Sequence, residues 1–228
     1  MNGFLLLDKA LSITSNDAIN GVKRFLPRRI KIGHAGSLDP LATGVLVLMI
    51  GQATKQCENV MRLPKEYVAT IELGATTETD DAEGVRQVRA VDRVPTMDDV
   101  REVCRQFVGE ILQTPPAYSA MKLDGKRAYA LVRAGKTVVM RPRPIRIDAI
   151  EIVDFAYPNL TIRVSCGRGT YVRSLARDIG ERLNTGGFLA GLRRTKVGPF
   201  TEDRAYTIDK LRGVDIASLL QPVDVIAG

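Results

Sequence analysis

The chain of 228 residues is poor in histidine and cysteine and has no long apolar run. Because His34 is its single histidine, a histidine-rich metal site is excluded, and a Ser-His-Asp hydrolase would have to use that one residue. The cysteines, Cys57, Cys104 and Cys166, are odd in number, widely spaced and outside any CxxC motif. This spacing argues against a disulfide framework and against zinc binding, and it fits the reducing cytoplasm.

Signals for membranes and secretion are also missing. No segment approaches the roughly 18 consecutive apolar residues of a membrane span. The N-terminus MNGFLLLDKALS has no basic start and no small-residue cleavage site, so we read no secretory signal. We therefore expect a cytoplasmic protein with no membrane partner.

The sequence contains no complete nucleotide-binding motif, and its carboxylate pairs lack the setting of a catalytic pair. The stretch AGKTVV at 134–139 lacks the first glycine of a phosphate loop, because position 130 is alanine, and no G-x-G-x-x-G follows a strand. The neighbouring carboxylates Asp80–Asp81 and Asp98–Asp99 have no hydrophobic setting that would split their pKa values. We interpret both pairs as solvated faces, and we expect neither a metal nor an organic cofactor.

What the chain does have is positive charge. The formal net charge is +7 and the pI about 9.5, which fits a polyanionic partner. Residues 122–146 hold eight basic residues against one acid, and residues 163–196 hold eight against two. The two blocks could form one positive face, or they could be scattered solvated charge, and both interpretations stay open.

Strand and helix patterns alternate without a regular βαβ rhythm, which predicts an α+β fold. We expect a large mixed, mainly antiparallel sheet flanked by helices in a single domain, 1–228, with the basic stretch from about 122 to 143 as an insertion protruding from the sheet. The helix starting near residue 14 should be capped by Ser15 or Asn16, the helix near 96 by Thr96, and the helix near 170 by Thr170. Apolar periodicity predicts strands at 3–9, 44–51, 65–74, 144–155 and 159–166, helices at 14–26, 96–109 and 170–183, and two short helices in the tail.

Asp39 is the one acidic residue in the stretch GHAGSLDPLATGVL, 33–46, which runs into the apolar segment Val45–Ile50. One explanation is structural, with Asp39 as a helix N-cap and Pro40 at the first helical position. The other is functional, because an ionised, oriented carboxylate on a Gly-rich loop can act as a nucleophile. In that case glycines 33, 36 and 44 would let a substrate approach the backbone, and the carboxylate would be buried.

Arg173 raises a matching question in CGRGTYVRSLARDIG, 166–180. If Thr170 caps the helix, Arg173 lies in its first turn, where the helix dipole disfavours a cation by a few tenths to about 1 kcal/mol. A solvated surface arginine is one alternative. A pair between Arg173 and Asp39 would satisfy both residues at once and keep Asp39 ionised.

Seven blocks of the sequence together resemble the TruB family of bacterial tRNA pseudouridine synthases. The resemblance runs from Gly3 to about Pro222 and carries the family's blocks in order. The blocks are DK…TSND, GHAGSLDPLATGVL, KEYVATIELG, TDDAEG, PPAYSAMKLDGKRAY, CGRGTYVRSLARDIG and LRRTKVGPF. The resemblance implies an isomerase that converts the T-loop uridine at position 55 of tRNA to pseudouridine, after flipping the base into a pocket.

The resemblance also implies roles for individual residues. Asp39 matches the catalytic aspartate of G-H-x-G-x-L-D-P, and Tyr67 the tyrosine that packs against the base and assists proton removal from C5. Arg173 matches the partner of the aspartate. The implied substrate-binding residues are His34 at the flipped-out loop nucleotides, Tyr171, Leu192 lining the base pocket, and Lys9 in a supporting role. For the nucleophile, addition at C6 of the ring and attack at the ribose C1′ both stay open.

Two departures from the family pattern stand out. The family opens D-K-P-x-G, whereas this chain has DKALS, with Ala10 and Ser12. Family members often carry a small C-terminal RNA-binding, PUA-like domain after the equivalent of LLQPVDVI, and we expect it to be absent from this chain. The expected partner is the T-arm of tRNA and the expected state a monomer. The alternatives are the catalytic domain of an RNA-guided pseudouridine synthase and a non-catalytic RNA-binding or tRNA-folding chaperone.

Overall fold

The computed structural model describes residues 1–119, 121–123 and 125–226, except for the side chains of 122, 123, 126 and 127. The chain divides into two compact units. Unit 1 comprises Met1–Val68 and Leu192–Gly228, and unit 2 comprises Ala69–Gly191. Strands β4 (Lys65–Leu73) and β12 (Gly187–Val197) each contribute residues to both units.

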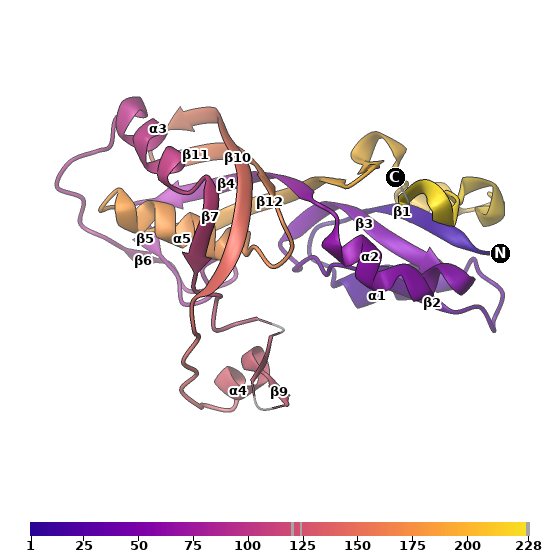
Figure 1. Cartoon of the computed structure of the whole chain (residues 1–228). Coiled ribbons are helices and arrows are strands. Elements are labelled where there is room, and N and C mark those ends of the chain that lie inside the picture. Colours follow the sequence, from indigo (N-terminus) through magenta and orange to yellow (C-terminus); the bar gives the residue numbers. More distant parts are fainter. Residues whose placement is uncertain (120, 124, 227–228) are drawn as a thin grey trace. The chain divides into compact units, whose positions relative to one another are not determined.

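The main sheet is mixed and mainly antiparallel, as the sequence predicts. Its strands are hydrogen-bonded in the order β1-β3-β12-β4-β11-β10-β7, with β2 on β3 and β13 on β12 (Figure 1). The β3–β12 pairing is parallel, whereas β1–β3, β2–β3, β7–β10, β10–β11 and β12–β13 are antiparallel. The remaining strands of this sheet are β1 (Gly3–Lys9), β2 (Ile32–Ala35), β3 (Ala42–Ile50), β7 (Gly109–Gln113), β10 (Arg143–Ala156), β11 (Asn159–Cys166) and β13 (Phe200–Thr201).

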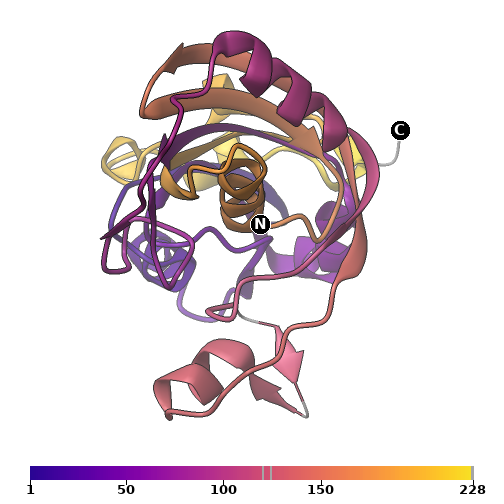
Figure 2. The same ribbon diagram turned by 90° about the vertical axis from the view of Figure 1, so that its left-hand side faces the viewer.

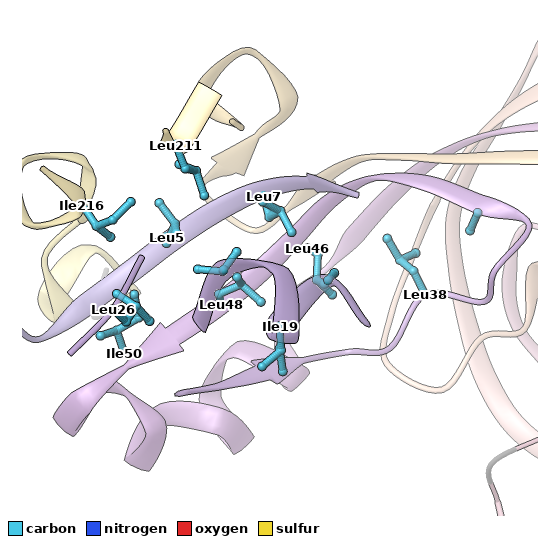
Figure 3. Close-up of a cluster of buried hydrophobic side chains, with 13 residues drawn as sticks. Leu5, Leu7, Ile19, Leu26, Leu38, Leu46, Leu48, Ile50, Leu211 and Ile216 are labelled. Atoms are coloured by element: carbon cyan, nitrogen blue, oxygen red, sulfur yellow. The ribbon is translucent and has the colours of Figure 1, made fainter. Parts of the chain in front are cut away.

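In unit 1 both faces of the central strands are buried, which explains their continuous apolar runs. Strands β1 and β3 pair from Gly3 opposite Ile50 to Lys9 opposite Gly44, so alternate side chains point to opposite faces. One face packs against α1 (Ser15–Lys23), and Figure 3 shows this cluster reaching Leu38. The other face packs against α2 (Cys57–Arg62), which follows η1 (Gly51–Gln56), and holds the edge-to-face pair Phe4–Phe200 with ring centroids 5.2 Å apart.

The first helix is capped one residue before the first of the two predicted caps. Its N-cap is Thr14, and the Thr14 hydroxyl and the Asp17 carboxylate form a reciprocal capping box. Ser15, one of the two predicted caps, is the first helical residue and is buried. Its hydroxyl is therefore available for another partner.

Unit 2 holds strands β7, β10 and β11 with the helices α3 (Met97–Gln106) and α5 (Val172–Arg182). The capping prediction for α3 is confirmed, because Thr96 and Asp99 form a capping box. For α5 it is wrong by one residue: Tyr171 is the N-cap, and Thr170 instead donates to the carbonyl of Gly167 at 3.2 Å. A short pair, β5 (Ala75–Thr76) and β6 (Gln87–Val88), completes this unit's regular structure apart from the basic stretch.

The basic stretch, up to Arg143 at the start of β10, lies outside the main sheet. It forms its own pair, β8 (Lys122–Leu123) and β9 (Lys126–Arg127), followed by α4 (Ala128–Arg133) (Figures 1 and 2). The single acid counted in this block, Asp124, lies outside the described residues. Of the described basic side chains, Arg133, Lys136 and Arg141 are exposed.

The tail differs from the two predicted short helices. It holds four short 3₁₀ helices, η2 (Glu202–Arg204), η3 (Asp209–Leu211), η4 (Ile216–Leu219) and η5 (Val223–Ile226). Leu211 and Ile216 are buried against the α1 face of the sheet, so the tail is part of the unit 1 core. Within the described part of the chain, no helix has the length and apolar character needed to cross a membrane.

Candidate active site

Asp39 lies on the loop 36–41 that joins β2 to β3, and no helix begins there. The amide of Ala42 donates to the carbonyl of Asp39 at 3.0 Å, which closes a turn containing Pro40 directly before β3. The structural explanation of Asp39 as a helix N-cap is therefore wrong. The Asp-Pro pair starts a tight turn into a strand.

The backbone of this loop is held from the side of α1 and the end of β1. The Ser15 hydroxyl donates to the carbonyl of Leu38 at 3.0 Å and accepts from the Leu38 amide at 2.9 Å. The amide of Ser12 and the ammonium of Lys9 both donate to the carbonyl of Pro40, at 2.9 and 3.5 Å. The residues on both sides of Asp39 are thus tied to neighbouring segments.

Lys9 is only 1% exposed, and its ammonium also donates to the carbonyls of Ala10 and Ile13, at 2.8 and 2.7 Å. A buried ammonium needs such acceptors because desolvating an isolated charge is costly. These contacts support the loop 10–13 and, through Pro40, the loop of Asp39. Direct contact between Lys9 and RNA stays a prediction.

The expectation that the Asp39 side chain is buried is wrong, because Asp39 is exposed. Its apolar neighbours Leu38 and Ala42 turn inward and are 5% and 0% exposed. The apolar residues next to Asp39 in the sequence are therefore buried, whereas Asp39 itself is not. The carboxylate remains accessible to a substrate.

One of the three glycines near Asp39 serves protein packing rather than substrate approach. At Gly44, with φ +94°, a Cβ would lie 2.2 Å from the carbonyl oxygen of Arg194. The expectation is therefore wrong for Gly44, which is glycine because β12 passes close to β3. At Gly36, φ +76° favours glycine, and a Cβ would lie at an ordinary contact distance of 3.4 Å from the Arg194 guanidinium. Substrate approach at Gly33 and Gly36 stays a prediction.

Tyr67 and Leu192 lie in unit 1 with the loop. Both are partly buried and pack against the hydrophobic cluster that includes Leu38 and Ala42. Leu192 is the register partner of Ala42, and its carbonyl accepts from the Thr43 hydroxyl at 3.4 Å. Tyr67 lies on β4, with its side chain on the same face as Ala69 and Ile71, as predicted. The structure thus gathers Tyr67, Leu192 and the Asp39 loop around one cluster.

His34 lies on β2, two residues before Gly36, and is half-buried. Its Nδ1 atom is buried without a hydrogen-bond partner. Burial, together with the positive charge of Arg194, lowers the pKa of the imidazole below its usual value. His34 is therefore neutral at pH 7.

In unit 2, Arg173 lies in the first turn of α5, as predicted, and is 7% exposed. Its guanidinium donates to the Asp81 carboxylate at 3.2 Å and to the carbonyls of Thr79 and Tyr118, at 3.1 and 2.9 Å. The alternative of a solvated surface arginine is therefore wrong. Asp81 is one carboxylate that Arg173 contacts.

Asp81 corrects the interpretation of the Asp80–Asp81 pair as a solvated face. Asp81 is 1% exposed and accepts from the Thr79 hydroxyl at 2.6 Å and the Glu83 amide at 3.1 Å. Asp80 pairs with Arg177 at 2.7 Å, and burial raises its pKa despite that neighbour. For Asp98 the interpretation is confirmed, since its side chain is 88% exposed.

Tyr171 caps α5 through its backbone, where Gln113 accepts from its amide at 2.8 Å and donates to its carbonyl at 3.1 Å. The Arg143 guanidinium lies 5.3 Å from the centre of the Tyr171 ring, within cation–π range. This stacking orients the ring from the end of the basic stretch.

Only part of the second basic block, residues 163–196, lies at the protein surface. Arg173 and Arg194 are buried, and Arg177 and Arg193 form ion pairs with Asp80 and Asp8. A positive face that includes the two buried arginines is therefore excluded. The exposed members of this block are Arg168, Arg182 and Lys196.

Asp39, Tyr67, Leu192, His34 and Lys9 lie in unit 1, whereas Tyr171 and Arg173 lie in unit 2. The Asp39–Arg173 pair stays a prediction. Sequence reasoning from single residues missed Ser15, Asp81 and Arg194, although each falls inside one of the seven quoted blocks. No group of three or more His, Cys, Asp or Glu side chains in the described ranges is placed to hold a metal ion.

Comparison with known proteins places these features in one family. The model of the TruB family pseudouridylate synthase N-terminal domain matches residues 23–172, and that of the tRNA pseudouridylate synthase B C-terminal domain matches 173–226. The tRNA pseudouridine synthase B of Burkholderia mallei is 46% identical over 99% of this chain and 75% of its own length. That of Aromatoleum aromaticum is 45% identical over 100% of this chain and 74% of its own.

Solved structures agree with this assignment. A chain of a Cbf5-Nop10-Gar1 complex superposes with a TM-score of 0.74 at 29% identity, covering 98% of this chain and 61% of that one. A chain of the archaeal box H/ACA Nop10-Cbf5 complex gives 0.71 at 28% identity, covering 98% and 60%. The present chain thus spans about 60% of the length of these two. From its family-model matches and its similarity to bacterial relatives over its whole length, the chain belongs to the TruB family of pseudouridylate synthases.

Proposed function

We propose that the protein isomerises uridine to pseudouridine at position 55 in the T loop of tRNA, with Asp39 as the nucleophile. The observation that carries the proposal is the Asp39 loop, whose backbone is anchored at Leu38 and Pro40 while the carboxylate between them is exposed. An accessible nucleophile on a fixed backbone is what an addition to a bound base requires. Family membership and the bacterial relatives support the substrate.

The reaction begins with extrusion of the uridine from the T loop, which costs a few kcal/mol of unstacking. Asp39 then attacks, either at C6 of the ring or at the ribose C1′. In both routes the N1–C1′ bond breaks, the base turns, a C5–C1′ bond forms, and the C5 proton leaves as N1 gains one. Because substrate and product have the same atoms, the balance requires neither an oxidant nor a group donor.

Other side chains divide the remaining tasks. Tyr67 packs against the base and assists proton removal from C5, and Leu192 lines the base pocket beside Ala42. Arg173 pairs with Asp39 and orients its carboxylate. The neutral imidazole of His34 and the ring of Tyr171 offer flat surfaces to unstacked loop nucleotides, which is how RNA loops are commonly bound.

The basic stretch supplies phosphate contacts, and binding is therefore salt-dependent. Arg133, Lys136 and Arg141 are exposed and carry this task among the described side chains. The protein acts as a monomer on the T-arm, and a tRNA substrate places it in the bacterial cytoplasm. Direct contact between Lys9 and RNA is secondary to its support of the Pro40 carbonyl.

The decisive test is Asp39→Asn, assayed with a T-arm transcript by mapping pseudouridine in the product. We expect folding and RNA binding close to those of the unaltered protein, because the Asp39 side chain is exposed, and no product, because an amide is not a nucleophile here. Asp98→Asn is the matched control: it replaces another exposed aspartate and should retain full activity. Turnover by Asp39→Asn would remove Asp39 from the mechanism.

The same assay separates the alternative functions. The likeness to a chain of the archaeal box H/ACA sRNP Nop10-Cbf5 complex favours one alternative, a catalytic domain that acts only with a separate RNA. Activity of the purified chain alone on the T-arm transcript contradicts it. A tRNA-folding chaperone, in contrast, would keep its full effect in Asp39→Asn.

A further inference from the structure

Arg194 is among the largest fully buried side chains that the structure describes, at 1% exposed, and it lies on β12 two residues after Leu192. Its Nε atom donates to the carbonyl of Val45 at 2.7 Å, and its Nη2 atom donates to the carbonyl of Gly36 at 3.0 Å. Gly36 directly follows β2 on one side of Asp39, and Val45 lies in β3 on the other side. One guanidinium therefore joins the two arms of the loop.

Stability alone does not account for this arginine. Among the described residues, no carboxylate forms an ion pair with Arg194, so backbone carbonyls alone receive its charge. Burying a cation is costly, and replacing buried charges by apolar side chains of similar volume is often neutral or stabilising. A charge retained in such a place calls for a task other than holding the core together.

The backbone around Arg194 is built for close contact with the loop. Arg194 is the register partner of Gly44, where any Cβ would collide with its carbonyl. The guanidinium lies near Gly36, where a Cβ would be at an ordinary contact distance of 3.4 Å from Nη1. Gly44 is thus the glycine that makes room for the backbone of Arg194.

We propose that Arg194 is a positioning residue of the isomerase, holding both arms of the Asp39 loop through the Gly36 and Val45 carbonyls. Ser15 and Lys9 hold the loop from the side of α1, and Arg194 holds it from β12. The planar guanidinium supplies two donors in fixed directions, which a lysine ammonium cannot copy. The kinetic consequence rests on the proposed function, whereas the geometric consequence does not.

His34 makes the geometry measurable without any activity assay. The charge of Arg194 contributes, after burial, to the lowered pKa of His34. Because His34 is the only histidine in the chain, its imidazole protons give a single titrating NMR signal. That signal reports whether a cation occupies the Arg194 position in the folded protein.

The experiment compares Arg194→Lys and Arg194→Met with the unaltered full chain. Both variants should lose about 10- to 100-fold in kcat, with KM for the T-arm changed less than about threefold, because a misplaced nucleophile affects the reaction more than binding. In Arg194→Met the pKa of His34 should rise, since the charge is gone. In Arg194→Lys it should stay lowered.

Val197→Ala is the matched control. Val197 is fully buried on the same strand, so the substitution destabilises the core without removing a hydrogen bond to the Asp39 loop or a charge near His34, and kcat and the His34 pKa should change much less than in the Arg194 variants below the unfolding transition. Normal kcat in Arg194→Lys would overturn the proposal, as would an unmoved His34 signal in folded Arg194→Met. If Arg194→Met does not fold, Arg194→Lys decides by its kcat.

The unaltered chain provides one more check. An ordinary pKa for its His34 would contradict the placement of Arg194 and overturn the proposal. A different result separates the two proposals. If neither the unaltered chain nor the variants form pseudouridine, but the His34 titrations behave as expected, the proposed function is contradicted and the placement of Arg194 is supported.

Discussion

The two units hold their proposed catalytic groups in opposite ways. In unit 1 the protein fixes the backbone around Asp39, using donors from Ser15, Lys9 and Arg194, and leaves the carboxylate exposed. In unit 2 it fixes a side chain: the Arg173 guanidinium is buried and bonded to Asp81 and two carbonyls. The nucleophile is held through its main chain, and the cation through its head group.

The difference follows from what each group has to do. A nucleophile must be reached by the substrate, so its side chain cannot be covered, and only its backbone can be restrained. A guanidinium acts through the direction of its N–H bonds, so several of those bonds can be committed to the protein while others point elsewhere. Breaking a buried ion pair costs about 3–5 kcal/mol, whereas a single hydrogen bond contributes about 1 kcal/mol, or about 1.5–3 kcal/mol where its donor is charged, as it is at Lys9 and Arg194. Unit 2 should therefore respond more strongly to substitution.

The largest effect is expected for Arg173→Lys. Lysine keeps the charge but lacks the fork that reaches Asp81, Thr79 and Tyr118 together, so kcat should fall about 100-fold. Single-turnover kinetics on a T-arm transcript measure this. Arg177→Lys, one turn along α5, serves as the control and should lose much less. Near-normal turnover by Arg173→Lys would refute the orienting role and remove the contrast between the units.

A middle-sized effect is expected for Asp81→Asn. The amide keeps the shape of the carboxylate but removes the negative charge that Asp81 offers the buried Arg173, which should lower the free energy of unfolding by about 3 kcal/mol. Activity should fall about tenfold because the guanidinium is less well oriented. Denaturant unfolding and steady-state kinetics check the two expectations.

Asp80→Asn is the matched control for Asp81→Asn, one residue away. Burial raises the pKa of Asp80 despite Arg177, so the ionised form gains little from its surroundings. Its loss should change the free energy of unfolding by less than about 1 kcal/mol near pH 7, where both carboxylates are ionised in the unfolded chain. Equal destabilisation by the two variants would contradict the distinction drawn between these carboxylates.

The smallest effect is expected for Ser12→Gly, on the unit 1 side. Ser12 has φ +64°, a left-handed conformation that glycine adopts without strain, and its amide still donates to Pro40 after the change. Relief of strain and the added freedom of the unfolded chain partly cancel, so the unfolding free energy should rise by less than about 1 kcal/mol. Thermal unfolding measures this, and a clear loss would show that the hydroxyl stabilises the loop.

Local pattern predicted most of the elements but not all of their ends. The strands 3–9 and 159–166 and the helix near 96 follow from apolar periodicity and a capping box. The cap at Thr14 was missed because its neighbours Ser15 and Asn16 are equally good capping residues, and the cap at Tyr171 was missed because no side-chain hydrogen bond marks it. The tail was missed because 3₁₀ turns have no lasting periodicity.

Sequence reasoning likewise predicted some features of the candidate site and missed others. The residue types around Asp39 raised two explanations, and only the resemblance to a family distinguished them before the structure was known. Asp81 was misjudged because a neighbouring carboxylate and nearby threonines make the stretch look solvated in the sequence. Its buried partner Arg173 is 92 residues away along the chain.

The amino-acid sequence by itself determined the local elements, the positive charge and the blocks that identify the family, because these depend on residues near one another in the chain. Only the tertiary structure decided that Asp39 is exposed, that Asp81 is buried against Arg173, and that Gly44 makes room for Arg194. Each of these depends on segments far apart in the sequence, whose burial and electrostatics arise only when the strands pair.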